Sequence, residues 1–159
     1  MADIAAGSSY FLSGVMQGSK ANGDGVEGTV NQDYRQLLKD AILAADPSAT
    51  IIEPWDLVGA EVAKMYPEGT PQSEMFKDDA HVRQAFEVCV AAAAAATVVV
   101  SYLPEASMGS AVEIFKAKVA GRKIIVVAPG SMAQNWVVRS YSDHTFDSID
   151  SLGAWLRSS

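Results

Sequence analysis

The sequence predicts an α/β fold in which a parallel sheet of about five strands carries helices on both faces. Short apolar runs alternate along the chain with segments of helical periodicity, and this alternation is typical of parallel strands joined by helices. The β-branched run at residues 97–103 suits a central strand buried on both faces. With 159 residues, 49% of them hydrophobic and 19% charged, the chain is expected to form one domain with a sizeable core.

The first third of the chain is expected to hold two short strands around one amphipathic helix. Residues 9–13 are an apolar strand candidate, and residues 50–53 form a second that ends at Pro54. Between them, Asn31 is a candidate N-cap for a helix that stops at Asp46 and Pro47. The apolar residues of this helix recur at three- and four-residue steps, which predicts one buried face: Tyr34, Leu37, Leu38, Ala41, Ile42 and Ala45.

The next segment, residues 55–78, contains Pro67, Gly69 and Pro71 and is expected to be a long loop of the kind found at active sites. Residues 79–96 predict a helix, because their many alanines favour helical backbone. The remaining expected elements are a strand at 97–103, a helix from about 108 to 120 with Gly121 after its end, a strand at 123–128, a short strand near 145–146 and a helix at about 148–156.

Ligands of parallel sheets bind at the carboxyl ends of the strands, so the loops at that edge are the candidate site. Three expected loops meet there, at residues 13–30, 104–110 and 129–136. In the last of them Asn135 and Trp136 are placed to reach the ligand or a neighbouring subunit. Trp136 either stacks on a base or anchors an interface, or it lies at the rim of the core.

The charge balance argues against polyanionic partners. The chain has 12 Lys and Arg against 19 Asp and Glu, a net charge of -7. Such a surface repels phosphate backbones and anionic lipids, so neither a nucleic-acid polymer nor a membrane is expected as a partner. The longest apolar run, residues 88–100, is too short to cross a bilayer, and the first residues lack the features of a secretory signal, which predicts a cytoplasmic location.

No metal or organic cofactor is expected. Cys89 is the single cysteine and there are two histidines, so disulfide and zinc patterns are absent from the sequence. Residues 22–25 have some likeness to a calcium loop, but Lys20 and Asn31 occupy the positions that need acidic ligands. The glycines match neither phosphate-binding motif of the ATP and dinucleotide enzymes.

The segment 107–113 joins the central strand to a helix and has two interpretations. Its small residues and first-turn amides can cradle a phosphate, with the Ser107 and Ser110 hydroxyls as further donors. Alternatively, Ser110 and Glu113 are three residues apart and form a capping box, in which Glu113 only satisfies a backbone amide. The local sequence leaves both open.

Charged residues gather where the helix at 79–96 begins. His81 and Arg83 stand close to Asp78 and Asp79, and they either hold a ligand and transfer protons or form local ion pairs at a solvated helix start. Further along the same helix, Cys89 is most simply a small core residue.

Taken together, these segments resemble the nucleoside 2-deoxyribosyltransferase family, and most closely its nucleoside 5′-monophosphate N-glycosidase branch. The resemblance begins at residues 10–14, Tyr-Phe-Leu-Ser-Gly, and is strongest over residues 97–127. It continues at Asn135-Trp136-Val137 and at Ser142-Asp143. It implies that residues 1–159 form a single flavodoxin- or Rossmann-like domain with no cofactor.

The resemblance implies that Glu113 is a nucleophile that attacks C1′ of the sugar and expels the base, as in a retaining glycosidase. Ser107 matches the serine of the branch that hydrolyses monophosphates, whereas transferases of free nucleosides tend to have an acid there. It therefore favours hydrolysis of a nucleoside or deoxynucleoside 5′-monophosphate to free base and sugar phosphate. Tyr10 would help to set the sugar position, and the implied substrate-binding residues are Ser13, Gly14, Ser107, Gly109, Ser110 and Asn135, with Ser13 as a second phosphate donor.

The sequence departs from the family on the helix before the central strand. The family usually has an Asp there, near the base and the nucleophile, and ungapped spacing places Cys89 at that position. Asp79, His81 and Glu87 are the other candidates for the base side. The missing Asp supports one alternative, a non-catalytic nucleotide-binding domain. A base-exchanging deoxyribosyltransferase is the other alternative. The family's counterpart of Asn135 often reaches into a partner's site, which implies a homodimer or a larger assembly.

Overall fold

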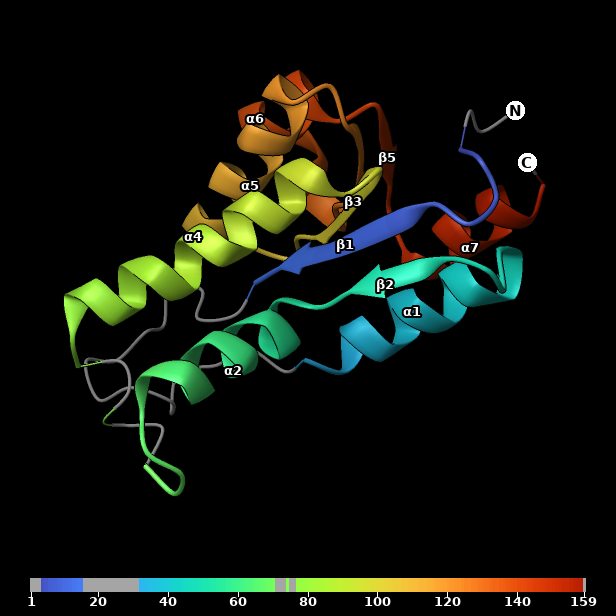
Figure 1. Cartoon of the computed structure of the whole chain (residues 1–159). Coiled ribbons are helices and arrows are strands. Elements are labelled where there is room, and N and C mark those ends of the chain that lie inside the picture. Colours follow the sequence, from blue (N-terminus) through green and yellow to red (C-terminus); the bar gives the residue numbers. More distant parts are fainter. Residues whose placement is uncertain (1–3, 16–31, 71–73, 75–76, 159) are drawn as a thin grey trace.

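The computed structural model describes residues 4–15, 32–70, 74 and 77–158. Its sheet has five parallel strands in the order β2-β1-β3-β4-β5, which confirms the predicted α/β class (Figure 1). The strands are β1 (Ser9–Gly14), β2 (Thr50–Ile52), β3 (Val98–Tyr102), β4 (Lys123–Val127) and β5 (His144–Phe146). The helices are α1 (Asp33–Ala45), α2 (Pro54–Met65), α4 (Asp79–Ala95), α5 (Met108–Val119), the 3₁₀ helix η3 (Gly130–Gln134), α6 (Trp136–Tyr141) and α7 (Ile149–Arg157).

The helices cover both faces of the sheet. Because successive side chains of a strand point to opposite faces, Phe11 packs with α2, α4, α5 and α6, whereas Leu12 packs with α1 and α7. Figure 1 shows α4, α5 and α6 on one side of the sheet and α1 and α7 on the other. The three central strands, β1, β3 and β4, are buried almost throughout, as β-branched runs covered on both faces should be.

The order of the strands places the end of β1 at the centre of the ligand edge. The chain passes from β1 to β2 on one side and later returns to β3 on the other, so the direction of winding reverses between β1 and β3. Ligands of open parallel sheets bind at this reversal, outside the carboxyl ends of the strands. Ser13 and Gly14 end β1 at this point, beside Ser101 and Tyr102 of β3.

The prediction of a long loop at residues 55–78 was wrong, because most of that segment's first half is helix α2. Pro54 stands at the first helical position, where its fixed backbone angle favours the helix and its missing N–H costs no hydrogen bond. Asp56 in the first turn and Lys64 in the last complement the helix dipole. The residues that break helices, from Pro67 onward, follow the end of α2 rather than interrupting it.

Of three further expectations, one falls outside the described residues and two differ from the structure. Asn31, the expected cap of α1, lies outside the described residues, and Gln32 flanks the helix without a side-chain capping bond. Leu37, expected in the buried face of α1, is 56% exposed, so that face consists of Tyr34, Leu38 and Ile42. Within residues 129–136, expected as a loop, the chain forms η3 and begins α6.

Among the described residues, no helix combines the length and the apolar character that crossing a membrane requires.

Gly14 is required by the packing of α1 on β1, and its replacement tests this contact. A Cβ at Gly14 would lie 2.8 Å from two ring carbons of Tyr34, which is buried and stacked on Tyr102. We expect Gly14→Ala to lower the free energy of unfolding by about 1–3 kcal/mol in denaturant titrations. Gly59→Ala is the matched control, because α2 has open space there and the helix should gain about 0.5–1 kcal/mol. Equal changes in the free energy of unfolding for the two substitutions would show that the Tyr34 ring can move away without cost.

Candidate active site

Glu113 and Ser13 form a buried polar contact between α5 and the end of β1. The Ser13 hydroxyl donates a 2.5 Å hydrogen bond to Oε2 of Glu113, although the two residues are 100 positions apart in the sequence. Ser13 is fully buried and Glu113 is 6% exposed. Among the described residues, Ser13 is the one hydrogen-bond donor to Glu113, so the second carboxylate oxygen has no such partner there. A short charge-assisted bond of this kind holds a carboxylate in a fixed orientation.

The beginning of α5 excludes the capping-box interpretation of Glu113. The N-cap is Ser107, whose side chain accepts a hydrogen bond from the Ser110 backbone N–H, so the helix begins three residues earlier than that interpretation requires. Glu113 therefore lies in the second turn, facing the sheet, and does not cap the helix. The hydroxyl of Ser110 is buried and has no hydrogen-bond partner among the described residues. An unsatisfied buried hydroxyl one turn from a buried carboxylate is typical of a binding site.

The environment of Glu113 perturbs its ionisation. Burial raises its pKa from 4.5 to about 7, while the Ser13 hydrogen bond and the positive charge of Arg35 lower it in part. A carboxyl group with such a pKa is partly ionised near neutral pH and can react as a nucleophile or exchange a proton there.

Arg35 and Tyr34, both from the first turn of α1, are the site residues that sequence analysis did not identify. Arg35 is 4% exposed, and it donates hydrogen bonds to the Leu12 carbonyl at 2.8 Å and to the Gln32 side chain at 2.7 Å. Tyr34 is buried beside Gly14, and burial together with the charge of Glu113 raises its pKa to about 12. One feature of the sequence could have indicated Arg35, because it directly follows Tyr34, the first residue of the predicted buried face of the helix.

Cys89 lies on the same side of the sheet as Glu113. Its thiol is 4.0 Å from the Pro54 carbonyl, at the beginning of α2. Burial raises the pKa of Cys89 to about 11, and the negative charge of Glu113 contributes to this rise while Arg35 opposes it. The position at which the family resemblance implies an Asp is thus held by a neutral thiol close to Glu113 and Arg35.

The other base-side candidates precede Cys89 in α4. Asp79 and His81 are in its first turn, roughly 12–15 Å from Cys89 by the rise of a helix. His81 contacts the Tyr66 hydroxyl and lies 3.8 Å from Asp78 rather than near Glu113. Glu87 is exposed on the same helix. The structure does not bring these three side chains to the buried carboxyl group.

Tyr10 and Ser13 also differ from their expected placements. Tyr10 packs on the opposite face of the sheet, and its pKa is raised by burial and by the charge of Asp46, at the far end of α1. It therefore does not reach a sugar at Glu113. Ser13 reaches the site, but its single proton is engaged by Glu113, so it is not available as a phosphate donor.

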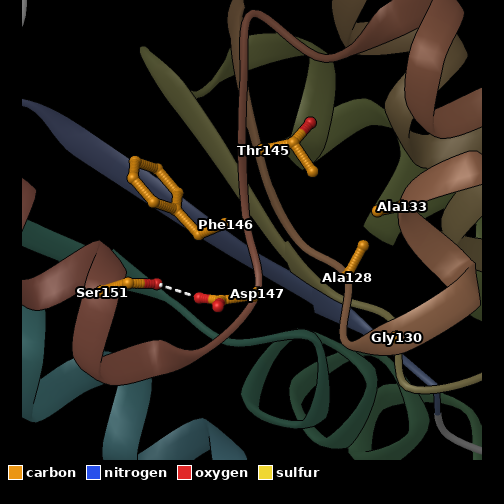
Figure 2. Close-up of a pocket in the computed structure, with 7 residues that line it drawn as sticks. All are labelled: Ala128, Gly130, Ala133, Thr145, Phe146, Asp147 and Ser151. Carbon is orange, nitrogen blue, oxygen red and sulfur yellow. Dashed lines mark hydrogen bonds between the residues drawn. The ribbon is translucent and has the colours of Figure 1, made fainter.

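No hydrogen bond joins Asn135 to Glu113 among the described residues. The Asn135 side chain accepts a hydrogen bond from the Val137 backbone N–H and caps α6, while Trp136 is 84% exposed. A separate pocket of about 390 Å³ lies at the carboxyl ends of β4 and β5, and Figure 2 shows the residues that line it. Its lining includes Ala128, Phe146 and the hydrogen-bonded pair Asp147 and Ser151, but not Glu113. Over the described ranges, no group of three or more His, Cys, Asp or Glu could hold a metal ion.

Comparison with solved structures identifies proteins of the same architecture. A conserved protein from Enterococcus faecalis V583 matches with a TM-score of 0.58 at 14% identity, covering 97% of this chain and 99% of that one. A 2-deoxyribosyltransferase from Bacillus psychrosaccharolyticus matches with a TM-score of 0.59 at 14% identity, covering 93% and 95%. This chain shares their fold. The α/β fold that the sequence predicts is thus also found in these proteins.

A CMP N-glycosidase from Clostridium botulinum also matches, at 13% identity over 93% of this chain and 96% of that one, but its TM-score of 0.49 is too low to establish a common fold. No family model and no curated protein matches the sequence.

The raised pKa of Glu113 predicts a stability change that depends on pH. The folded protein disfavours the ionised carboxylate, so ionisation of Glu113 lowers the free energy of unfolding. This loss is nearly absent below pH 4.5 and fully present above about 7. We expect the unfolding free energy of Glu113→Gln to exceed that of the parent protein by only about 1 kcal/mol at about pH 5, but by up to roughly 3 kcal/mol at about pH 9.

Denaturant titrations at the two pH values measure this difference, with the exposed Glu87→Gln as the control that should show none. A loss of stability in Glu113→Gln that is the same at both pH values would mean that the carboxylate is not strained.

Proposed function

We propose that this protein is an enzyme, an N-glycosidase that hydrolyses a nucleoside or deoxynucleoside 5′-monophosphate to free base and sugar phosphate. The observation that carries the proposal is the Glu113–Ser13 contact, a buried carboxylate held in a fixed orientation at the ligand edge of the sheet. The shared fold with a 2-deoxyribosyltransferase supports the same class of chemistry at the same edge. In this proposal residues 1–159 form a single domain.

In the proposed reaction Glu113 is the nucleophile. Its ionised carboxylate attacks C1′, the C1′–N bond breaks with its electron pair going to the base, and a glycosyl ester remains on Glu113. Water then attacks C1′ and releases the sugar phosphate, so the configuration at C1′ is retained. Ser13 keeps one oxygen of Glu113 engaged, which aims the other at the sugar.

The turn between β3 and α5 is the proposed phosphate site. Ser107 accepts a hydrogen bond from the Ser110 N–H, and its own hydroxyl proton remains to be donated. Ser110 brings a buried hydroxyl that has no partner within the described part of the chain. Gly109 has no packing reason to be glycine, because an added Cβ would make only an ordinary 3.5 Å contact with Phe86. Small residues here leave room for a ligand near the helix amides.

A second candidate is supported by Glu105, which lies two residues before Ser107. One oxygen of its carboxyl group is buried and has no hydrogen-bond partner among the described residues. A negative charge in this turn would repel a 5′-phosphate and favour an unphosphorylated nucleoside. The corresponding activity is a 2-deoxyribosyltransferase, in which a second base rather than water takes the sugar from Glu113.

Release of free base from a panel of nucleosides and their 5′-monophosphates, followed by chromatography, tests both candidates. We expect release from monophosphates alone, a loss of at least about 1,000-fold in Glu113→Ala, and a rate that rises with pH through about 7 as Glu113 ionises. The exposed Glu87→Ala variant should keep full activity.

Base exchange on free nucleosides that requires an acceptor base would establish the transferase instead. Tight nucleotide binding without turnover would indicate a nucleotide-binding domain, and full activity in Glu113→Ala would end the proposal.

The proposed assembly is a homodimer or a larger homo-oligomer, and an exposed apolar stripe on α5 supports it. Met108, Val112, Phe115 and Val119 follow helical spacing, and they are 90%, 42%, 46% and 70% exposed. Trp136 adds a further exposed apolar side chain on α6, next to Asn135. Such a patch on the helix that carries Glu113 suits contact with a second copy, and Asn135 of that copy would then contact the sugar.

A charge placed in this stripe should weaken the assembly. We expect Val119→Lys to lower the molar mass measured by light scattering to that of a single chain, because a desolvated ammonium disfavours an apolar interface. Leu37→Lys is the control, since Leu37 is also exposed but lies on α1. A molar mass that stays unchanged in Val119→Lys, or that is already that of one chain in the parent protein, would contradict the assembly through α5.

A further inference from the structure

Arg35 has a donor that the fold does not use. Its Nε donates to Oε1 of Gln32 and its Nη1 to the Leu12 carbonyl, which fixes the guanidinium plane. The side chain is 4% exposed, yet Nη2 is buried without a hydrogen-bond partner among the described residues. Leaving such a donor unsatisfied costs about 1–3 kcal/mol. A structural role therefore accounts for the hydrogen bonds of Nε and Nη1 but not for the burial of Nη2.

The guanidinium lies on the β2 side of Glu113. The Ser8 carbonyl accepts a hydrogen bond from Thr50 of β2, and carbonyls two and four residues further along β1 point the same way. Since the pairing of β1 with β2 ends at Phe11 and Ile52, the Leu12 carbonyl projects beyond the end of β2, and Arg35 occupies the vacated position. Pro54 and Cys89 lie on this same side.

The phosphate cradle lies on the other side of Glu113. Ser107 and Ser110 belong to the turn after β3, and β3 flanks β1 opposite to β2. A nucleotide whose phosphate binds this turn and whose C1′ meets Glu113 therefore directs its base toward Arg35 and Cys89. This step rests on the proposed function.

We propose that Arg35 is a catalytic residue that binds the departing base through Nη2 and stabilises the negative charge it acquires. When Glu113 bonds to C1′, the C1′–N electron pair moves onto the base, and a fixed cation hydrogen-bonded to the base lowers the energy of that anion. Arg35 keeps its proton. Water later supplies the hydroxyl that C1′ receives and the proton that neutralises the base.

Two neighbouring groups, Cys89 and Ser13, are poorly suited to protonate the departing base, which favours this role for Arg35. Cys89 has a pKa of about 11, so it is a poor acid for protonating a leaving base near neutral pH. Ser13 already donates to Glu113, and no ion pair joins Arg35 to Glu113 among the described residues. A permanently charged, anchored guanidinium thus stands where the chemistry would otherwise require a proton donor.

The assignment also defines the class of base. A guanidinium N–H needs an acceptor, and the acceptor must share the charge that develops on the glycosidic nitrogen. A heterocycle with a carbonyl oxygen or an unprotonated ring nitrogen adjacent to that nitrogen meets both conditions.

Substrates that differ only in their leaving group test the proposal. One is a nucleoside 5′-monophosphate that the protein cleaves, and the other is the 4-nitrophenyl glycoside of the same sugar 5-phosphate, whose leaving group is stable as an anion. We expect Arg35→Gln to lower kcat/KM for the nucleotide by roughly 100- to 1,000-fold but for the nitrophenyl substrate by less than about 10-fold. An equal loss on both substrates would reduce Arg35 to a structural role and overturn the proposal.

Three variants separate the possible failures. Arg35→Lys keeps the positive charge but lacks the several N–H donors of the guanidinium. It should fold even if Arg35→Gln does not, and its kcat/KM should fall less, again more for the nucleotide than for the nitrophenyl substrate. Arg122→Gln removes an arginine that also donates to a backbone carbonyl, that of Ala94 near the end of α4, and should change neither rate. Glu113→Gln should abolish both reactions. If Glu113→Gln remains active on both substrates, the proposed function itself is refuted. If Glu113→Gln is inactive but Arg35→Gln loses the same activity on both substrates, only the role of Arg35 is refuted.

Discussion

The burial of one carboxyl group is the constraint on which the site depends. Glu113 sits between α5 and the sheet, where loss of water raises its pKa to about 7 even though Ser13 and Arg35 both favour its ionised form. An anion in such a position is less stable than in water, so the fold tolerates a local cost in order to keep a reactive group at the ligand edge. The compensation comes from the Ser13 hydrogen bond of β1 and from the positive charge of Arg35 on α1.

The end of β1 contacts the helices on both faces of the sheet. Ser13 and Gly14 are consecutive, so they face opposite sides of the sheet. Ser13 points to α5 and engages Glu113, while Gly14 has no side chain and lets the Tyr34 ring of α1 approach the strand. That approach brings the next residue, Arg35, to the strand's edge beyond β2. The short length of β2 is therefore part of the site, because a longer strand would fill the position of the guanidinium.

Local patterns were sufficient for most of the fold but not for the contacts that form the site. The strands β3 and β4 are contiguous apolar runs, so their burial can be predicted from sequence. Helix α2 was missed because Pro67, Gly69 and Pro71 suggest a loop for the whole segment 55–78, whereas the helix begins at Pro54 and ends before these residues. Ser110 and Glu113 matched a capping pattern, but Ser107 already caps the helix. The Glu113–Ser13 pair and the burial of Arg35 depend on tertiary packing that no short motif encodes.

The two sides of Glu113 differ in charge, and this difference separates two aspects of specificity. On the β2 side the unpaired donor of the Arg35 guanidinium would meet the base, so the acceptor pattern of the heterocycle would matter there. On the β3 side the described donors are hydroxyls and helix amides, with the Glu105 carboxyl close by, so a phosphate would be bound by dipoles against a nearby acid. Because the two sets of residues come from different elements, α1 and the β3–α5 turn, a change on one side need not disturb the other. Preference for a base and preference for a phosphate can therefore evolve independently around the same carboxylate.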